Sequence, residues 1–336
     1  MAAVLSVEML LGPADRVRHA VYRALGPWAG AWASNRERRI AWLGVALVLL
    51  ALAATVTVPL WMLALGPIVF GVPHVVADVR YLVVRPGYHR RLPLVVAAGA
   101  PLAVGAATGD VVWAMIAAAG ALFVARTSWP RRLTGLTVAI TLAVVCARLP
   151  GYAELAFAHL HNLIALALWW AYRPRRTCLH AIPLLLFSAL SLALLCGMAE
   201  PVLATAGTLA GPEGASSLRA HLRSLAPFAG PELGFRLVLA YAFAQAVHYA
   251  VWLRLVPEED RAREAPRSFT SSWRALREDL GLTSLAIAFA LALGVAVWAA
   301  VSLAEARTGY LRFAVFHGQL EVVAAALLWS EGRRRC

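Results

Sequence analysis

Histidines and carboxylates stand at helical spacing inside apolar segments of this chain. His74 and Asp78 are four residues apart, and so are His317 and Glu321. Residues four apart share one face of an α-helix. An imidazole with a carboxylate one turn away can chelate a transition metal, or can act as a ligand with its hydrogen-bond acceptor. The two pairs therefore predict a buried metal site.

Three further histidines and a tyrosine belong to the same pattern. His159 and His161 are two residues apart, so only one of them can point fully into a helical bundle. His248 is followed by Tyr249, which could line a pocket or simply pack. The predicted metal ligands are His74, His159, His161, His248, His317, Asp78 and Glu321, and the predicted catalytic groups are Asp78, Glu321 and Tyr249.

The composition identifies the kind of protein that must hold these residues. Of the 336 residues, 61% are hydrophobic and only 15% are charged, and the mean hydropathy is +0.70. A soluble domain usually carries about 25% charged residues. These values argue against a soluble globule, a disordered chain and a disulfide scaffold. We expect an all-α fold, a polytopic helical bundle integral to the membrane.

Apolar runs of membrane-spanning length divide the chain. Residues 1–39 predict an N-terminal amphipathic segment on the membrane surface, and residues 40–336 a single transmembrane domain. An outer loop, which could be re-entrant, is expected at 199–234, and a charged cytoplasmic loop at 256–280. The ten predicted spans are 40–58, 60–84, 93–108, 110–126, 133–148, 151–172, 180–198, 235–255, 281–304 and 312–331.

The basic residues orient these spans. All 31 are arginines, and the formal net charge is +13. With the N-terminus in the cytoplasm, 25 of the arginines fall on the cytoplasmic side, as the positive-inside rule requires. This distribution predicts a multi-pass protein of a bacterial-type inner membrane with both termini cytoplasmic. No soluble basic domain is present to hold nucleic acid, so the lipid bilayer is the expected partner.

The positions of these histidines and carboxylates indicate one shared site. They lie on spans 60–84, 151–172, 235–255 and 312–331, which all run from outside to inside. Ionisable groups within a bilayer usually face the bundle interior or a cavity. We therefore expect four helices to converge near mid-depth. Pro67 and Pro73 further predict that span 60–84 is broken just before His74.

A short motif suggests a family. Residues 70–78 (FGVPHVVAD) resemble the glycine–x–proline–histidine–glycine–alanine–x–aspartate motif of the Brp/Blh family of integral-membrane β-carotene dioxygenases. The resemblance covers one span. It implies that His74 is an iron ligand and that Asp78 is a nearby support. Val75 stands where the family has a small residue, and the family's paired HxxxH is missing.

Several functions fit these residues. The leading hypothesis is a metal-dependent membrane oxygenase or oxidoreductase that uses non-haem iron and a lipophilic substrate. A redox partner is compatible with this hypothesis. Zinc, copper and manganese remain alternatives as the metal. A bis-histidine haem protein that carries electrons and a proton- or metal-coupled transporter are alternative functions. A structural or assembly role for a partner protein also stays open, although it would leave the buried histidines without a purpose.

Overall fold

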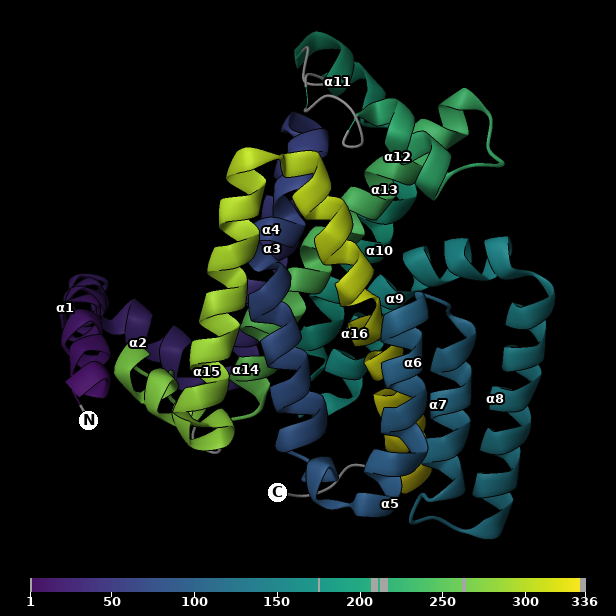
Figure 1. The fold of residues 1–336 in the computed structure, drawn as a ribbon. Helices are drawn as coiled ribbons and strands as arrows, with labels where there is room; N and C mark the ends of the chain where they lie inside the picture. Colours follow the sequence, from purple (N-terminus) through teal and green to yellow (C-terminus); the bar gives the residue numbers. More distant parts are fainter. Residues whose placement is uncertain (1, 175, 207–210, 212–216, 262–263, 333–336) are drawn as a thin grey trace.

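The computed structural model describes residues 2–174, 176–206, 211, 217–261 and 264–332. Within these ranges the chain is helical and contains no β-strand. Figure 1 shows a bundle of long helices with α1 and α2 set apart on one side and α8 at the opposite edge. The all-α class expected from the composition is confirmed.

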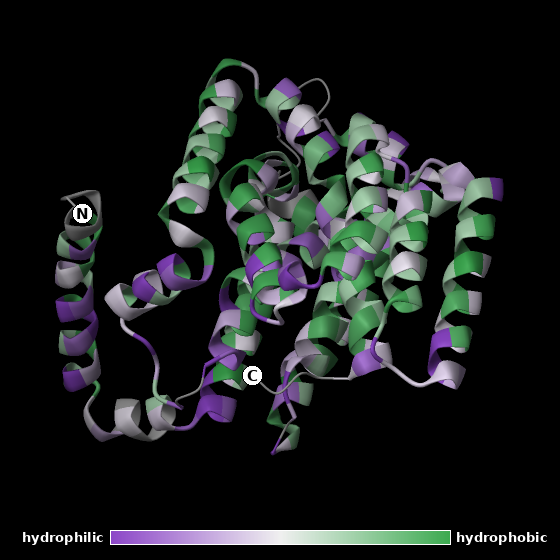
Figure 2. Cartoon of the chain, turned by 60° about the horizontal axis from the view of Figure 1, so that its bottom comes forward, coloured by the Kyte–Doolittle hydropathy of each residue, from purple (hydrophilic) through white to green (hydrophobic). Residues whose placement is uncertain are grey.

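Seven helical segments are long and apolar enough to cross a membrane, which is compatible with an integral membrane protein. Figure 2 shows apolar residues along these helices and hydrophilic ones at several helix ends. The seven segments are α3 (Arg36–Thr57); α4 (Pro59–Asp78) with the π-helix η1 (Val79–Val84); α8 (Trp129–Arg148); α9 (Pro150–Tyr172); η4 (Cys178–His180) with α10 (Ala181–Leu195); α15 (Phe269–Val301); and α16 (Leu303–Glu331).

The other three predicted spans are helical but do not meet the same criteria. Span 93–108 is a composite of α5 (Leu92–Leu94), the π-helix η3 (Val95–Gly99) and α6 (Ala100–Thr108). Span 110–126 is α7 (Val112–Phe123), whose 12 residues rise only about 18 Å, against about 30 Å of hydrocarbon. Span 235–255 is α13 (Pro231–Ala250) with the π-helix η6 (Val251–Leu255). By length and composition, the structure therefore supports seven of the ten predicted spans.

The N-terminal segment docks on the bundle through polar contacts. Helix α1 (Ala2–Ala24) lies beside the start of α15, and α2 (Gly26–Ser34) leads into α3 (Figure 1). Asp15 accepts hydrogen bonds from the backbone amides of Phe269 at 2.7 Å and Thr270 at 3.1 Å. Glu8 forms an ion pair with Arg274 at 2.7 Å. A carboxylate at a helix N-terminus satisfies orphan amides there, so Asp15 ties α1 to the first turn of α15.

Both predicted loops contain helices. Region 199–234 forms α11 (Glu200–Ala206) and α12 (Leu218–Leu225), and its residues 207–210 and 212–216 lie outside the described ranges. Region 256–280 forms α14 (Val256–Glu259) and the first turns of α15, and its residues 262–263 are likewise not described. Helix α15 is interrupted at Gly281, where φ is +77°. Glycine adopts this left-handed conformation without strain, and residue 281 is where the span was predicted to begin.

The charged part of the second loop is buried, contrary to the predicted hydrophilic loop. Glu258 is fully buried, and Glu259 and Arg261 are only 2% and 5% exposed. Close contacts with an arginine and a histidine make this burial tolerable. Glu259 pairs with His180 at 3.0 Å, and Glu258 pairs with Arg261 at 2.9 Å.

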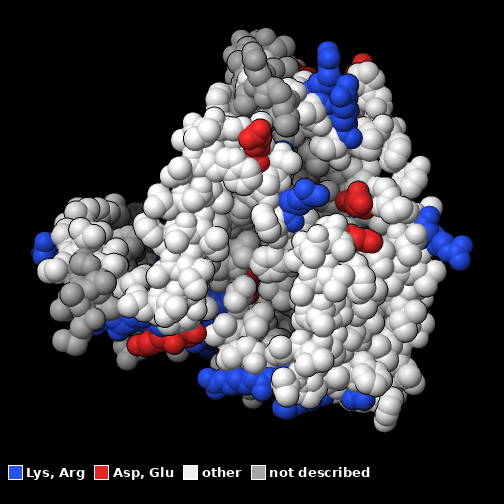
Figure 3. Space-filling model, viewed as in Figure 1, with Lys and Arg blue, Asp and Glu red and all other residues white. Residues whose placement is uncertain are grey.

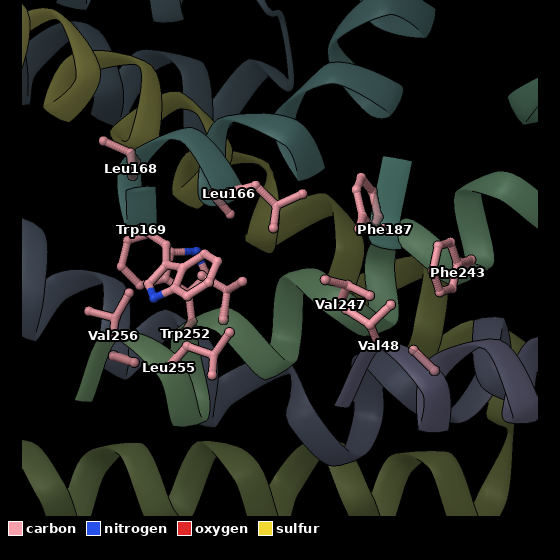
Figure 4. Packing of buried hydrophobic residues seen from close by; sticks show 14 of the residues in the cluster. Val48, Leu166, Leu168, Trp169, Phe187, Phe243, Val247, Trp252, Leu255 and Val256 are labelled. Atoms are coloured by element: carbon pink, nitrogen blue, oxygen red, sulfur yellow. The ribbon is translucent and has the colours of Figure 1, made fainter. Parts of the chain in front are cut away.

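Aromatic and branched side chains of α3, α9, α10, α13 and η6 form the largest apolar core. Figure 4 shows Trp169 and Trp252 side by side, with Phe187 and Phe243 farther along the same cluster. Phe187 and Phe243 stack with their ring centroids 5.3 Å apart. This packing fixes α9 and α13 relative to each other, and both helices carry predicted site residues.

Replacing Gly120 by alanine should destabilise the protein by about 1–3 kcal/mol. A Cβ atom at Gly120 would stand 2.0 Å from the backbone carbonyl oxygen of Ala97, so α7 and η3 would have to separate. Gly99→Ala is the matched control, because its Cβ would meet only a side-chain carbon of Val95 at 3.9 Å. The midpoint of thermal unfolding in detergent measures both variants. Equal midpoints for G120A and G99A would contradict the prediction.

Candidate metal centre

Four histidines from four helices converge at one point inside the bundle. His74 comes from α4, His161 from α9, His248 from α13 and His317 from α16. The ring of His74 lies 4.6 Å from that of His317 and 5.5 Å from that of His248, between centroids. The ring of His161 lies 5.2 Å from His248 and 5.7 Å from His317. These are the four helices whose sequences carry the intramembrane polar residues.

The ring nitrogens have a spacing suited to a metal ion. His74, His248 and His317 each offer a nitrogen, and the three atoms lie within 4.8 Å of one another. Nitrogens bound to one ion at about 2.0–2.1 Å would lie roughly 3–4 Å apart. Small rotations of the rings would therefore complete the coordination, and the donors are nitrogen with no thiolate among them.

Backbone carbonyls orient three of the four rings. Nδ1 of His74 lies 3.0 Å from the carbonyl oxygen of Phe70, and Nδ1 of His161 lies 2.9 Å from that of Ala158. Nδ1 of His317 makes the same kind of contact with the carbonyl oxygen of Ala314. A histidine that donates Nδ1–H in this way presents an unprotonated Nε2, as metal-bound histidines commonly do.

Two carboxylates, Asp78 and Glu321, are fully buried on the helices that carry His74 and His317. Glu321 accepts a hydrogen bond from the indole Nε1 of Trp252 at 2.6 Å. Its Oε1 also lies 3.7 Å from Nε2 of His248. Among the described residues, neither carboxylate oxygen of Asp78 has a hydrogen-bond partner, nor does Oε2 of Glu321. Buried carboxylates without partners are costly unless a positive charge is near, and a metal cation would supply that charge.

His159 lies outside this group, which corrects its prediction as a metal ligand. Its Nε2 lies 2.9 Å from the carbonyl oxygen of Leu225, at the end of α12. Its ring packs edge-on against Tyr241, with 5.5 Å between the centroids. Two residues along a helix turn the side chain by about 200°, so α9 directs His161 to the centre and His159 to the end of α12.

A cavity of about 290 Å³ opens onto the histidines. Tyr249, predicted as a catalytic group, lies on its wall with its ring 4.9 Å from that of His74. Phe157 and Tyr310 add aromatic surface, and Glu154 contributes a carboxylate. The cavity could therefore take an apolar group next to the ring nitrogens.

Sequence reasoning missed two residues at the centre. Trp252 bonds to Glu321, and Tyr310 lines the cavity with a buried hydroxyl that has no hydrogen-bond partner among the described residues. Both stand at helical spacing from a predicted ligand. Trp252 follows His248 by four residues, and Tyr310 precedes His317 by seven. The shared helix face was the signal that could have found them.

The backbone changes its winding beside the centre. Helix α4 passes into the π-helix η1 directly after Asp78, and α13 passes into η6 two residues after His248. Short π-helical segments are frequent at functional sites. The predicted break at the prolines is wrong, because α4 runs without interruption through Pro67 and Pro73.

The arrangement does not fit a bis-histidine haem. Two axial imidazoles must face each other across a planar macrocycle. Here His161 and His317 lie 5.2 Å and 5.8 Å from the ring of His248, and His74 lies 4.6 Å from His317. Four imidazole rings gathered at such short distances leave little room for a planar macrocycle between two of them.

Comparisons with protein-family models, with curated proteins and with solved structures find no match to the chain. The four-histidine geometry is therefore the basis for assigning a function. Its clearest features are the convergence from separate helices, the carbonyl-bound Nδ1 atoms and the adjoining cavity.

Proposed function

We propose that the chain is a metal-dependent membrane oxidoreductase, an oxygenase that uses non-haem iron and acts on a lipid-soluble substrate. The convergence of His74, His161, His248 and His317 at the edge of a cavity is the observation that carries the proposal. Imidazole ligands suit iron, and also zinc and copper. When bound, iron would supply one-electron chemistry and open coordination positions.

The chain's own residues would orient the ligands and balance their charge. The carbonyl oxygens of Phe70 and Ala158 hold His74 and His161 in the Nε2-free tautomer. Asp78 and Glu321 would offset the charge of the cation from a fully buried position. Trp252, by bonding to Glu321, keeps that carboxylate beside His248.

The cavity wall favours an apolar substrate. Tyr249, Tyr310 and Phe157 surround the space next to the histidines. An aromatic enclosure binds an apolar group and excludes water from the reacting position. Three of the four helices that carry the histidines, α4, α9 and α16, are long and apolar enough to cross a membrane, where a lipid-soluble compound would be concentrated. The resemblance of residues 70–78 to the Brp/Blh motif supports a polyene as the compound to test first.

The proposal predicts a stoichiometric metal. Protein expressed with added iron and purified in mild detergent should contain about one iron per chain, since the histidines form a single centre. Elemental analysis of iron, zinc, copper and manganese measures the metal content. Stoichiometric zinc without iron would contradict the redox assignment. A folded protein without any of the four metals would contradict the metal centre itself.

A further inference from the structure

A second and larger hollow lies on the side of the bundle, away from the four histidines. It measures about 510 Å³ and runs between α4 with η1, η6 and the long helix α15. Trp252 forms part of its wall and also donates a hydrogen bond to Glu321. None of the four histidines, and neither Asp78 nor Glu321, lines this cleft.

The two ends of the cleft differ in chemistry. Its apolar part includes Val72 and Val76 of α4 and Ala288 and Phe289 of α15. The other end is lined by four arginines and by no acidic residue, within the part of the chain that the structure describes. The four arginines are Arg80, Arg254, Arg261 and Arg267.

Arg80 pairs with Asp279 at 2.7 Å, so the excess positive charge comes from the other three lining arginines. Glu258 is the partner of Arg254 at 3.3 Å and of Arg261 at 2.9 Å, and it also pairs with Arg39 at 3.2 Å. One carboxylate thus serves three guanidinium groups. Because Arg39 and Arg261 are buried, the surplus positive charge is screened little by water.

The pKa of Arg261 reflects first its burial and then the neighbouring positive charges. Burial lowers the pKa of Arg261 to about 10, although Glu258 opposes the change. The guanidinium groups of Arg39, Arg254 and Arg267 lower the pKa further, because like charges repel. Of the described carboxylates, none lies within 4.0 Å of the Arg267 guanidinium. The mouth of the cleft therefore favours an anion.

The apolar end of the cleft leaves hydrophobic side chains of α15 uncovered by the rest of the protein. No residue of α15 is buried by the rest of the protein. Figure 3 shows a row of arginine side chains along the lower edge of the molecule, below a largely uncharged surface. A ligand that suits both ends must carry an anionic group joined to a hydrocarbon chain.

We propose that this cleft binds an anionic phospholipid from the leaflet on the arginine-rich side. Arg254, Arg261 and Arg267 hold its phosphate. An acyl chain lies between Val76 of α4 and Ala288 of α15. Guanidinium groups form charge-assisted hydrogen bonds with phosphate oxygens, and the apolar walls bury hydrocarbon. The proposal does not depend on the metal or on the reaction.

The test uses the full-length protein in detergent, with phosphatidylglycerol and phosphatidylcholine of identical acyl chains as probes. Native mass spectrometry counts bound lipid, and thermal unfolding reports stabilisation. We expect phosphatidylglycerol to bind and to raise the unfolding midpoint, and phosphatidylcholine to do neither. The double variant R254Q/R267Q should weaken phosphatidylglycerol binding by roughly tenfold or more, since two charged hydrogen-bond donors are lost. Arg131→Gln, an exposed arginine on α8, is the matched control and should bind as the parent does.

Three results would overturn the proposal. The first is equal binding of the two lipids, and the second is unchanged phosphatidylglycerol binding in R254Q/R267Q. The third is full stabilisation by inorganic phosphate alone, which would indicate a free-anion site. Should the double variant fail to fold, R267Q serves in its place, because no described salt bridge includes Arg267.

Discussion

Replacing His317 by alanine should weaken metal binding at least about 100-fold, leaving purified protein with little iron. His317 is buried in α16, and its ring lies 4.6 Å from that of His74 and 5.8 Å from that of His248. Even changes to outer partners of metal ligands commonly cost 10–100-fold in affinity, and the loss of a ligand should cost more. Elemental analysis after gel filtration measures the metal content of H317A.

His159→Ala is the matched control for this experiment. It removes an imidazole from α9, but the lost contacts are with Leu225 and Tyr241 rather than with the centre. H159A should keep the iron content of the parent. A variant H317A with full metal content beside a metal-free H159A would show that the ligand set is wrong. Loss of metal from both would indicate a general loss of structure, which circular dichroism would reveal.

Replacing Glu258 by glutamine should destabilise the protein by about 3–5 kcal/mol, the range for breaking a buried ion pair. The carboxylate of Glu258 is fully buried, and it pairs with Arg39, Arg254 and Arg261. Arg39 and Arg261 are themselves buried, so their charges would remain away from water without a counter-charge. The yield of monodisperse protein and the midpoint of thermal unfolding measure the effect.

Glu264→Gln tests whether burial, rather than charge, causes that loss. Glu264 pairs with Arg176 at 3.2 Å, but the two side chains are 56% and 83% exposed. Exposed ion pairs contribute between about 0 and 1 kcal/mol. E264Q should therefore unfold close to the parent temperature. Similar midpoints for E258Q and E264Q would mean that the arginines beside Glu258 do not depend on it.

The class of the protein and the helices of its candidate centre could be predicted from local patterns. Long apolar runs predict membrane helices because each residue carries its own transfer free energy. Intramembrane histidines and carboxylates predict inward-facing positions, since exposing them to lipid is costly. His74 with Asp78, and His317 with Glu321, needed only the helical period to be grouped. The same helical spacing, applied to His317 and His248, would have identified Tyr310 and Trp252.

The features that depend on how the helices rotate and pack could be established only from the structure. It turned His161 rather than His159 to the centre, and it placed Trp252 on Glu321, 69 residues away in the chain. It also buried Glu258 within a segment that resembles a loop in sequence. Helical spacing establishes which residues share a face, but not which neighbour that face meets. Which neighbour each helix face contacts depends on long-range packing and on paired charges, and these are established only when the chain folds.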